Sequence, residues 1–245
     1  MELNITPAGW GILALCGVLV GLSKTALPGA GILAVPLAAM AVPARASVGL
    51  LLPLLIFADL FAAAYYRRQA QWSCLLRLLP AALLGIAAGF VLMQHLDDRR
   101  LAPLIGVVVL AMLTLKARGF SSNGNRPPSG RLFAYAMGFA AGVTTLLANA
   151  AGPVMTLYLL SMKLDKDKFV GTSAWFFFVV NWLKVPFLWH LGLITPQSLP
   201  ADVYVFPAVA LGAVGGIILL RHIPQRLFEI LTVVLAAAAA VKLLF

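Results

Sequence analysis

The sequence carries little charge and very little negative charge. Only 11% of its 245 residues are charged, and 8 acidic residues stand against 18 lysines and arginines. A soluble domain carries about 25% charged residues, whereas 62% of this chain is hydrophobic and its mean hydropathy is +0.99. A chain of this length cannot hide so much apolar surface from water, so lipid must surround most of it. The composition excludes a soluble domain and predicts an all-α polytopic membrane protein.

The motifs of several enzyme classes are also missing. The chain has no Walker motif, no nucleotide-binding glycine loop and no cluster of metal ligands. Its two cysteines, Cys16 and Cys74, lie in or beside apolar runs and indicate neither a disulfide framework nor a metal site. We therefore expect no cofactor, no metal and no ATPase of its own. Glu2 and the lack of a basic stretch near the start argue against a cleaved signal peptide.

The net charge of +10 reflects membrane orientation and not nucleic-acid binding, because the basic residues form short clusters between apolar runs. A helix needs about 20 residues to cross roughly 30 Å of hydrocarbon. The first two runs of each half are shorter than this, and we expect each such pair to be a broken helix pair that meets near mid-membrane. The apolar runs fall at about 8–23, 27–42, 46–66, 75–93, 101–117, 131–148, 150–162, 169–190, 203–220 and 225–244.

The two halves of the chain resemble each other. Residues 21–36 place a lysine, two hydroxyls, two prolines and three glycines inside apolar chain, and residues 142–156 repeat the pattern. Two copies of one unit explain this similarity, with residues 1–120 as the first repeat, 121–130 as a cytoplasmic linker and 131–245 as the second repeat. Shifts of 121 and then 122 residues align Gly21 with Gly142, Pro28 with Asn149, Gly31 with Gly152, Gly49 with Gly171 and Asp59 with Asn181.

The basic residues indicate how the two copies are oriented. If each broken pair enters and leaves on one face, twelve lysines and arginines fall on one face and four on the other, with Lys24 and Lys184 inside the membrane. If each pair crosses only once, the split is eight to eight. The positive-inside rule favours the first arrangement, which places both termini outside the cytoplasm. We therefore expect two inverted-topology repeats, each a broken or re-entrant helix pair plus three transmembrane helices, as in many secondary transporters.

The helix breaks are the candidate binding site. Unpaired N–H groups at a break are tolerated in a membrane only beside protein or a water-filled cavity, and helix N-termini favour anions. Breaks at residues 27–29 and 148–150 can each start a half-helix, and inversion would aim both at one central point. Alternatively, the glycines only allow close helix packing and the threonines bond back to their own helices. The candidates at the breaks are Lys24, Thr25, Pro28, Gly29, Thr144, Thr145, Asn149, Ala150 and Gly152.

Charged residues inside apolar runs are costly and suggest function. Lys184 is one such candidate, although its side chain can also extend to the outer membrane surface. Asp59 is the only acid within a strongly apolar run. It can pair with a lysine or accept a coupling proton, and a packing role near Arg67 is the alternative. Asn181 holds the equivalent place in the other copy and cannot titrate, so carboxylate-based coupling would be asymmetric.

Two further polar candidates lie near the start of the 169–190 run. We expect Ser173 and Trp175 to line the same cavity as the helix breaks. A tryptophan is as often a packing residue or an anchor at the membrane interface, so the alternative for Trp175 stays open.

Three stretches of the chain, residues 24–37, 148–155 and 169–177, carry a family resemblance over nearly the whole length. They resemble the TauE/SafE family, also called the sulfite exporter or TSUP family. The resemblance implies a carrier of the bacterial inner membrane that moves sulfite or an organosulfonate such as sulfoacetate. Ala26 stands where many relatives have glycine, which concerns only local helix packing. By position, the resemblance points to Lys24, Thr25, Asn149, Gly152, Ser173 and Lys184.

The sequence thus predicts a secondary active transporter and not an enzyme, with Asp59 as the coupling residue. The expected partners are a small sulfur oxyanion or organosulfonate, protons, the lipid bilayer and, in a homodimer, a second copy of the chain. Nucleic acid is not an expected partner. The alternatives are an intramembrane hydrolase that uses Ser23 and Lys24, a membrane scaffold without a transported ligand, and a passive anion channel. A centre filled with side chains would favour the scaffold.

Overall fold

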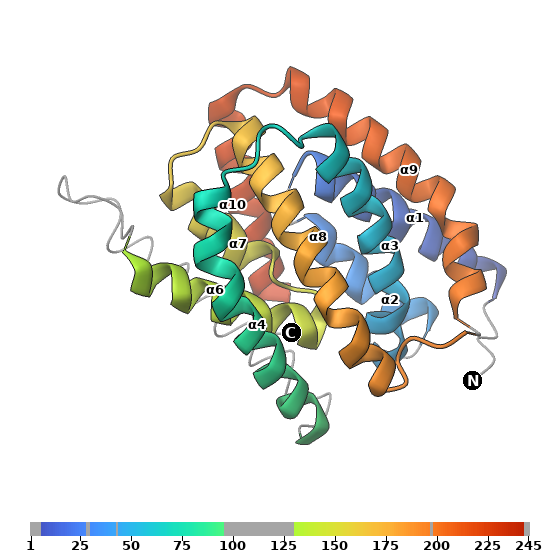
Figure 1. Cartoon of the computed structure of the whole chain (residues 1–245). Helices are drawn as coiled ribbons and strands as arrows, with labels where there is room; N and C mark the ends of the chain where they lie inside the picture. Colours follow the sequence, from blue (N-terminus) through green and yellow to red (C-terminus); the bar gives the residue numbers. More distant parts are fainter. Residues whose placement is uncertain (1–5, 28–29, 43, 96–129, 197, 243–245) are drawn as a thin grey trace.

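The computed structural model describes residues 6–27, 30–42, 44–95, 130–196 and 198–242, and every regular element in these ranges is a helix (Figure 1). The run predicted at 101–117 lies outside them. The helices are α1 (Pro7–Thr25), the 3₁₀ helix η1 (Ala30–Leu33), α2 (Ala34–Ala41), α3 (Ala44–Tyr65), α4 (Trp72–His95), α6 (Arg131–Ala148), α7 (Gly152–Ser161), α8 (Lys166–His190), α9 (Leu199–His222) and α10 (Gln225–Lys242).

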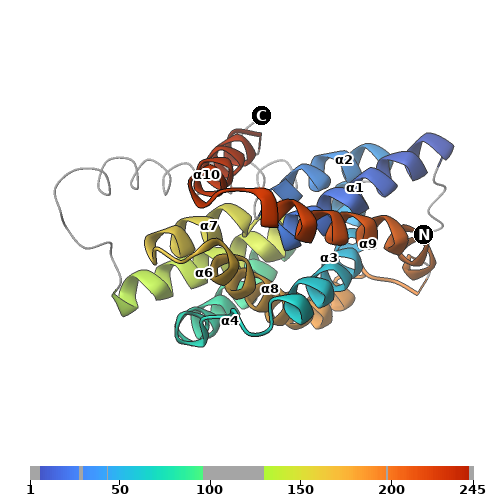
Figure 2. The ribbon, with the colours of Figure 1, turned by 90° about the horizontal axis from the view of Figure 1, so that it is seen from above.

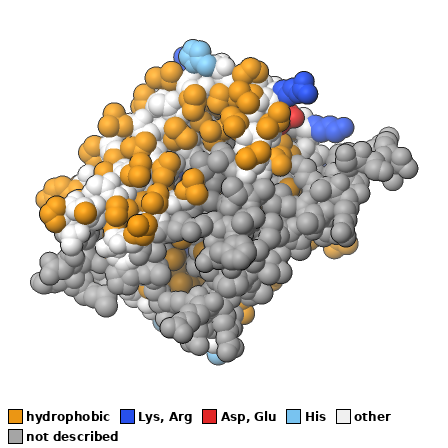
Figure 3. Space-filling view, turned by 180° about the vertical axis from the view of Figure 1, so that it is seen from behind, with side chains coloured by type: hydrophobic (Ala, Val, Ile, Leu, Met, Phe, Trp, Pro, Cys, Tyr) orange, Lys and Arg blue, Asp and Glu red, His pale blue; other side chains and the backbone are white. Residues whose placement is uncertain are grey.

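The predicted fold class is confirmed as an all-helical membrane chain. Five segments are long and apolar enough to cross a membrane, namely α1, α4, α6, α9 and residues Ala46–Tyr65 of α3. Large apolar side chains are exposed on these helices, including Leu132, Tyr204 and Leu211. Apolar side chains cover much of the described surface in Figure 3, and the lysines and arginines in view lie near its upper edge. Such a surface is stable in lipid and would aggregate in water.

Two pairs of parallel helices are held in very close contact by glycines. In the α1–α9 pair, a Cβ atom built on Gly21 would lie 2.2 Å from the carbonyl oxygen of Val209. In the α4–α6 pair, a Cβ atom on Gly142 would lie 2.1 Å from the carbonyl oxygen of Ala82. Only glycine fits at these positions, because the two backbones touch there.

The contacts of the two pairs correspond residue by residue. Each glycine contact in α1–α9 has a counterpart in α4–α6, so the two pairs pack alike. The predicted shift of 121 relates Gly17 and Gly21 to Gly138 and Gly142, whereas Gly85 and Gly89 correspond to Gly212 and Gly216 at a different shift. The corresponding contacts are Gly17–Val205 with Gly138–Leu78, Gly21–Val209 with Gly142–Ala82, Gly212–Val18 with Gly85–Phe139, and Gly216–Leu22 with Gly89–Val143.

Helices α3 and α8 pack against each other between these pairs, side by side in both views (Figures 1 and 2). They run antiparallel, because Gly49 lies against the chain that follows α8 whereas Gly171 near the start of α8 lies against Gln69. Between these contacts, Asp59 faces Asn181. The repeat equates Asp59 with Asn181 and Gly49 with Gly171, so the helices meet through equivalent residues. Two inverted copies would pack in this way, and the inversion itself stays a prediction.

Both predicted helix interruptions are present. Helix α1 ends at Thr25, and helical structure resumes in the described chain at η1, slightly later than the predicted start at 27–29; Pro28 and Gly29 lie outside the described residues. A proline at position 28 disfavours helical backbone at Leu27, which explains the end of α1. Helix α6 ends at Ala148, and its C-cap residue Asn149 has a left-handed φ of 53° and ψ of 28°, a conformation that asparagine tolerates better than most residues.

Candidate functional site

A small cavity of about 40 Å³ lies where the two interruptions meet. It has room for about three water molecules or a small oxyanion of similar bulk. Both predicted repeats contribute polar and apolar residues to its lining. The polar lining is Ser23, Lys24, Thr145, Asn149, Ser173 and Asn181, the glycines are Gly31 and Gly152, and the apolar lining is Val20, Ala34, Val35, Leu51, Leu55 and Phe177.

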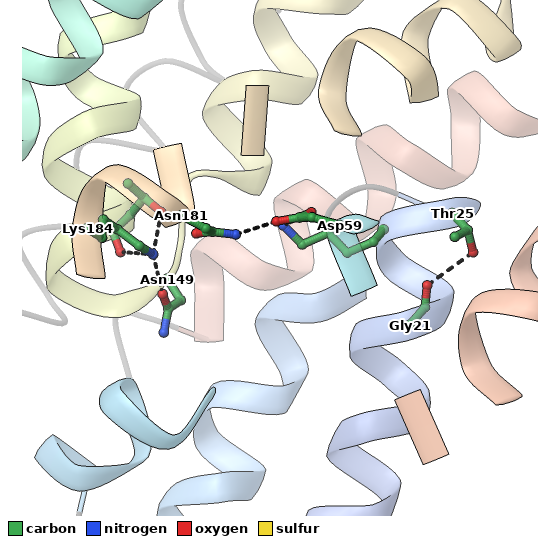
Figure 4. A network of polar contacts seen from close by, with 8 residues as sticks. Gly21, Thr25, Asp59, Asn149, Asn181 and Lys184 are labelled. Atoms are coloured by element: carbon green, nitrogen blue, oxygen red, sulfur yellow. Dashed lines mark hydrogen bonds and ion pairs between the residues drawn. The ribbon is translucent and has the colours of Figure 1, made fainter. Parts of the chain in front are cut away.

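Lys24 forms a buried ion pair at this cavity. Its ammonium lies 2.9 Å from Oδ1 of Asp59, and the two side chains are 9% and 0% exposed. Asn181 Nδ2 donates a 2.6 Å hydrogen bond to the other carboxylate oxygen, Oδ2 (Figure 4). The Lys24 ammonium also lies 3.9 Å from the ring centroid of Phe177, a cation–π contact. A buried ion pair is a costly way to stabilise a fold, so its position beside a cavity suggests function.

The second buried lysine, Lys184, lies close by but does not line the cavity. It is fully buried, and its ammonium donates to the carbonyl oxygen of Thr145 at 3.2 Å, to Oγ1 of the same residue at 3.1 Å and to Oδ1 of Asn149 at 2.6 Å. Lysine has three N–H donors, and all three are used. Because Thr145 and Asn149 do line the cavity, Lys184 acts on it through these two residues.

Asn149 connects the two halves of the molecule at the second interruption. Its side-chain Nδ2 donates to the carbonyl oxygen of Val48 on α3 at 3.2 Å, while its Oδ1 accepts from Lys184. Its backbone N–H closes the last turn of α6 on Thr145. The left-handed turn at Asn149 is thus fixed from both repeats, and it directs the chain into α7.

Helix α7 brings unpaired donors to the cavity. Its first residues are Gly152 and Pro153, and its N-cap residue Ala151 makes no side-chain capping bond. The first N–H groups of a helix have no partner within it, and Gly152 lines the cavity. The hydroxyls of Ser23 and Ser173 also face it without a hydrogen-bond partner in the described part of the chain. The two hydroxyls, the Lys24 ammonium and the start of α7 could each donate to a small oxyanion.

Besides Lys184 and Asp59, four predicted candidates do not line the cavity. The hydroxyl of Thr25 donates to the carbonyls of Gly21 and Ala213, and that of Thr144 donates to Ala140. This matches the alternative expectation that the threonines bond to backbone. The backbone N–H of Ala150 donates a hydrogen bond to the carbonyl oxygen of Thr144.

The fourth of these candidates, Trp175, packs against aromatic rings. Its ring centroid lies 5.2 Å from that of Trp72 and 5.8 Å from that of Phe178. This is the packing alternative given by the sequence.

The geometry also bears on the alternative functions. No hydrogen bond joins Ser23 to Lys24 among the described residues, and the Lys24 ammonium pairs with Asp59 instead, so the dyad of a hydrolase is not assembled. The centre between the interruptions is a cavity and is not filled with side chains, contrary to the scaffold expectation. Sequence reasoning missed Phe177. It gave close helix packing as the alternative role of the glycines but did not use the Gly-x-x-x-Gly spacing in four helices, which was a signal for the observed contacts.

The chain was compared with known protein families, curated proteins and solved structures. A family model described as "Sulfite exporter TauE/SafE" matches residues 13–243, nearly the whole chain. No curated protein and no solved structure matches it significantly.

Proposed function

The chain belongs to the sulfite exporter TauE/SafE family of membrane transporters, and on that premise we propose that it is a secondary active transporter of sulfite or an organosulfonate such as sulfoacetate. One observation carries the proposal. The two helix interruptions, far apart in the sequence, line one small cavity that is rich in donors. A small oxyanion would meet the Lys24 ammonium, the Ser23 and Ser173 hydroxyls and the N-terminus of α7 there.

The arrangement of the helices supports alternating access. The α1–α9 and α4–α6 pairs are joined by backbone contacts at glycines and so would move as rigid units. The antiparallel α3 and α8 lie between them; Asn181 of α8 lines the cavity, and Asp59 of α3 contacts both Asn181 and Lys24. If the copies are inverted, each copy can adopt the conformation that the other had. This change exposes the bound anion first to one side of the membrane and then to the other.

The Lys24–Asp59 pair supports coupling to protons. An anion that binds the Lys24 ammonium competes with Asp59 for it, and a buried carboxylate without its cation is costly. Uptake of a proton by Asp59 removes that cost, so anion and proton would bind together. Asn181 has no such role because an amide does not titrate. The protein would work in the bacterial inner membrane with both termini outside the cytoplasm.

The test combines ligand binding with one pair of matched variants. Purified protein is screened by thermal shift against sulfite, sulfate, thiosulfate, sulfoacetate, taurine and acetate, since a ligand that prefers the folded form raises the melting midpoint. Hits are titrated by calorimetry in wild type, Ser173→Ala and Ser161→Ala. Ser161 is a buried serine that donates to Tyr158 away from the cavity.

We expect Ser173→Ala to weaken binding of the preferred sulfur anion by about tenfold, the loss of one hydrogen bond to a charged group, and Ser161→Ala to bind it as wild type does. If no sulfur anion stabilises the protein, or if both variants bind equally well, the proposed site is wrong.

A further inference from the structure

We propose that the protein has a second, weaker site for the same small oxyanion, in a polar hollow where α3, α8 and α9 meet. This inference rests on the proposed function and adds a step to the transport path. The hollow has a volume of about 300 Å³ and is lined by Tyr65, Tyr66, Gln69, Asp167, Leu220 and Arg221.

The hollow and the central cavity lie along the same two helices, α3 and α8. The cavity is lined by Leu51 and Leu55 of α3 and by Ser173 and Phe177 of α8. The hollow is lined by Tyr65, at the end of α3, and by Asp167, in the first turn of α8. An anion that leaves the cavity along these helices toward the end of α3 would therefore reach the hollow.

Tyr66 connects the hollow to the end of α1. Its side chain is 4% exposed, and its hydroxyl donates a 3.1 Å hydrogen bond to the carbonyl of Thr25, the last residue of α1 and the neighbour of Lys24. Burial raises the pKa of this hydroxyl above its ordinary value, so it stays protonated and keeps donating. Tyr66 thus lines the hollow and is hydrogen-bonded to the residue that follows Lys24.

Arg221 is the group in the hollow that would bind an anion. Its Nε donates to the hydroxyl of Tyr65 at 3.1 Å, its Nη2 donates to the same oxygen, and its guanidinium carbon lies 5.7 Å from the Tyr65 ring centroid. These contacts hold the guanidinium in place and leave three of its five N–H bonds for a ligand. A fixed guanidinium suits the oxygen atoms of a sulfite or sulfonate group.

The other charges near the hollow make the site weak, as a release site must be. Asp167 in the first turn of α8 lines the hollow and repels an anion. Lys166 offsets this charge, but its ammonium is occupied by the carbonyls of Leu220 and Ile223 at 2.9 and 2.6 Å. The ligand would therefore depend on Arg221 for its direct charged contact.

The two tyrosines and the arginine that line the hollow have no counterparts of the same kind at the equivalent positions of the other repeat. The repeat assigns Phe187 and Leu188 to the places of Tyr65 and Tyr66, and the glycine contacts assign Gln94 to the place of Arg221. The opposite end of the molecule therefore lacks this cation and these phenols. The end that has them is the one that the positive-inside rule places in the cytoplasm.

The experiment measures equilibrium binding of radiolabelled sulfite by dialysis and its exchange in vesicles of phosphatidylethanolamine and phosphatidylglycerol. Wild type is compared with Arg221→Gln, Arg221→Lys and the control Arg226→Gln, an exposed arginine at the start of α10. We expect wild type to bind a second sulfite weakly and Arg221→Gln to keep only the tight site. Exchange at low sulfite should fall about tenfold in Arg221→Gln, less in Arg221→Lys, and not at all in Arg226→Gln.

The possible results separate the two proposals. If wild type binds one sulfite tightly and exchanges it, and Arg221→Gln behaves in the same way, the second site is wrong and the proposed function stands. If wild type neither binds nor exchanges sulfite or another sulfur anion, the proposed function fails and this inference fails with it. Equal losses in Arg221→Gln and Arg226→Gln would show a general effect of surface charge and would also overturn the second site.

Discussion

Lys24 and Asp59 form the buried ion pair on which the site depends. Pairing with a lysine was one of the roles that the sequence suggested for Asp59, beside uptake of a coupling proton and packing near Arg67. The sequence did not determine which of the two buried lysines takes that role, since this depends on how α1, α3 and α8 cross. Lys184 binds three oxygens at the end of α6 instead, and only the folded chain brings those oxygens together.

Removal of one member of the pair should destabilise the protein more than removal of both. Lys24→Met leaves the Asp59 carboxylate buried without its cation, which costs about 3–5 kcal/mol. The double variant Lys24→Met/Asp59→Asn has no buried charge at this place and should recover most of that loss. Thermal melting in detergent measures the difference. A double variant that melts no higher than Lys24→Met would show that the pair does not carry this energy.

The acid should also set the coupling to protons. Asp59→Asn keeps the size of the side chain and removes its ability to titrate, so sulfite exchange should continue while transport driven by a proton gradient is lost. Both rates are measured in vesicles with and without an imposed pH gradient. Gradient-driven accumulation by Asp59→Asn at the wild-type rate would exclude Asp59 as the coupling residue.

At the scale of helices, the sequence predicted most of the elements, because each described helix coincides with an apolar run. The details of the breaks were less predictable. The backbone between α1 and α2 resumes as a 3₁₀ helix at Ala30, and α7 begins at Gly152 after a left-handed turn at Asn149. That turn is fixed by Val48 and Lys184, both distant in sequence.

The glycine contacts make a sharp prediction within one helix. A Cβ atom on Gly212 of α9 would lie 2.1 Å from the carbonyl oxygen of Val18, whereas one on Gly215 meets nothing within 4 Å. Gly212→Ala must push α1 and α9 apart and should cost about 1–3 kcal/mol. Gly215→Ala should be neutral or stabilising by up to about 1 kcal/mol, because alanine favours helix. Melting temperatures that fall equally in both variants would contradict this packing.

At the scale of the whole molecule, the internal repeat stays a prediction from the sequence, and the two close helix pairs are compatible with it. A Cβ atom built on Gly85 or on Gly212 would lie 2.1 Å from a backbone oxygen of the neighbouring helix. These contacts could not be predicted from the sequence alone, because the shift of 121 or 122 residues that aligns the helix breaks does not place Gly85 of α4 on Gly212 of α9. The orientation of the halves in the membrane follows only from the basic residues.

That orientation can be tested by labelling. In a background without Cys16 and Cys74, a cysteine at Lys163, in the turn before α8, should react only with a reagent in the cytoplasm. A cysteine at Thr195, in the turn after α8, should react with a membrane-impermeant maleimide added outside intact cells. Labelling of both positions from the same side would contradict the predicted topology.

The central claim is that the two helix interruptions form one anion site beside Lys24, and diffraction with a heavy analogue tests it most directly. Selenite has the shape and charge of sulfite, and selenium gives an anomalous signal. In crystals grown with selenite, we predict an anomalous peak in the central cavity within hydrogen-bond reach of Lys24 Nζ and Ser173 Oγ. Crystals that show selenite bound only elsewhere, or no peak in the cavity at saturating selenite, would contradict the account.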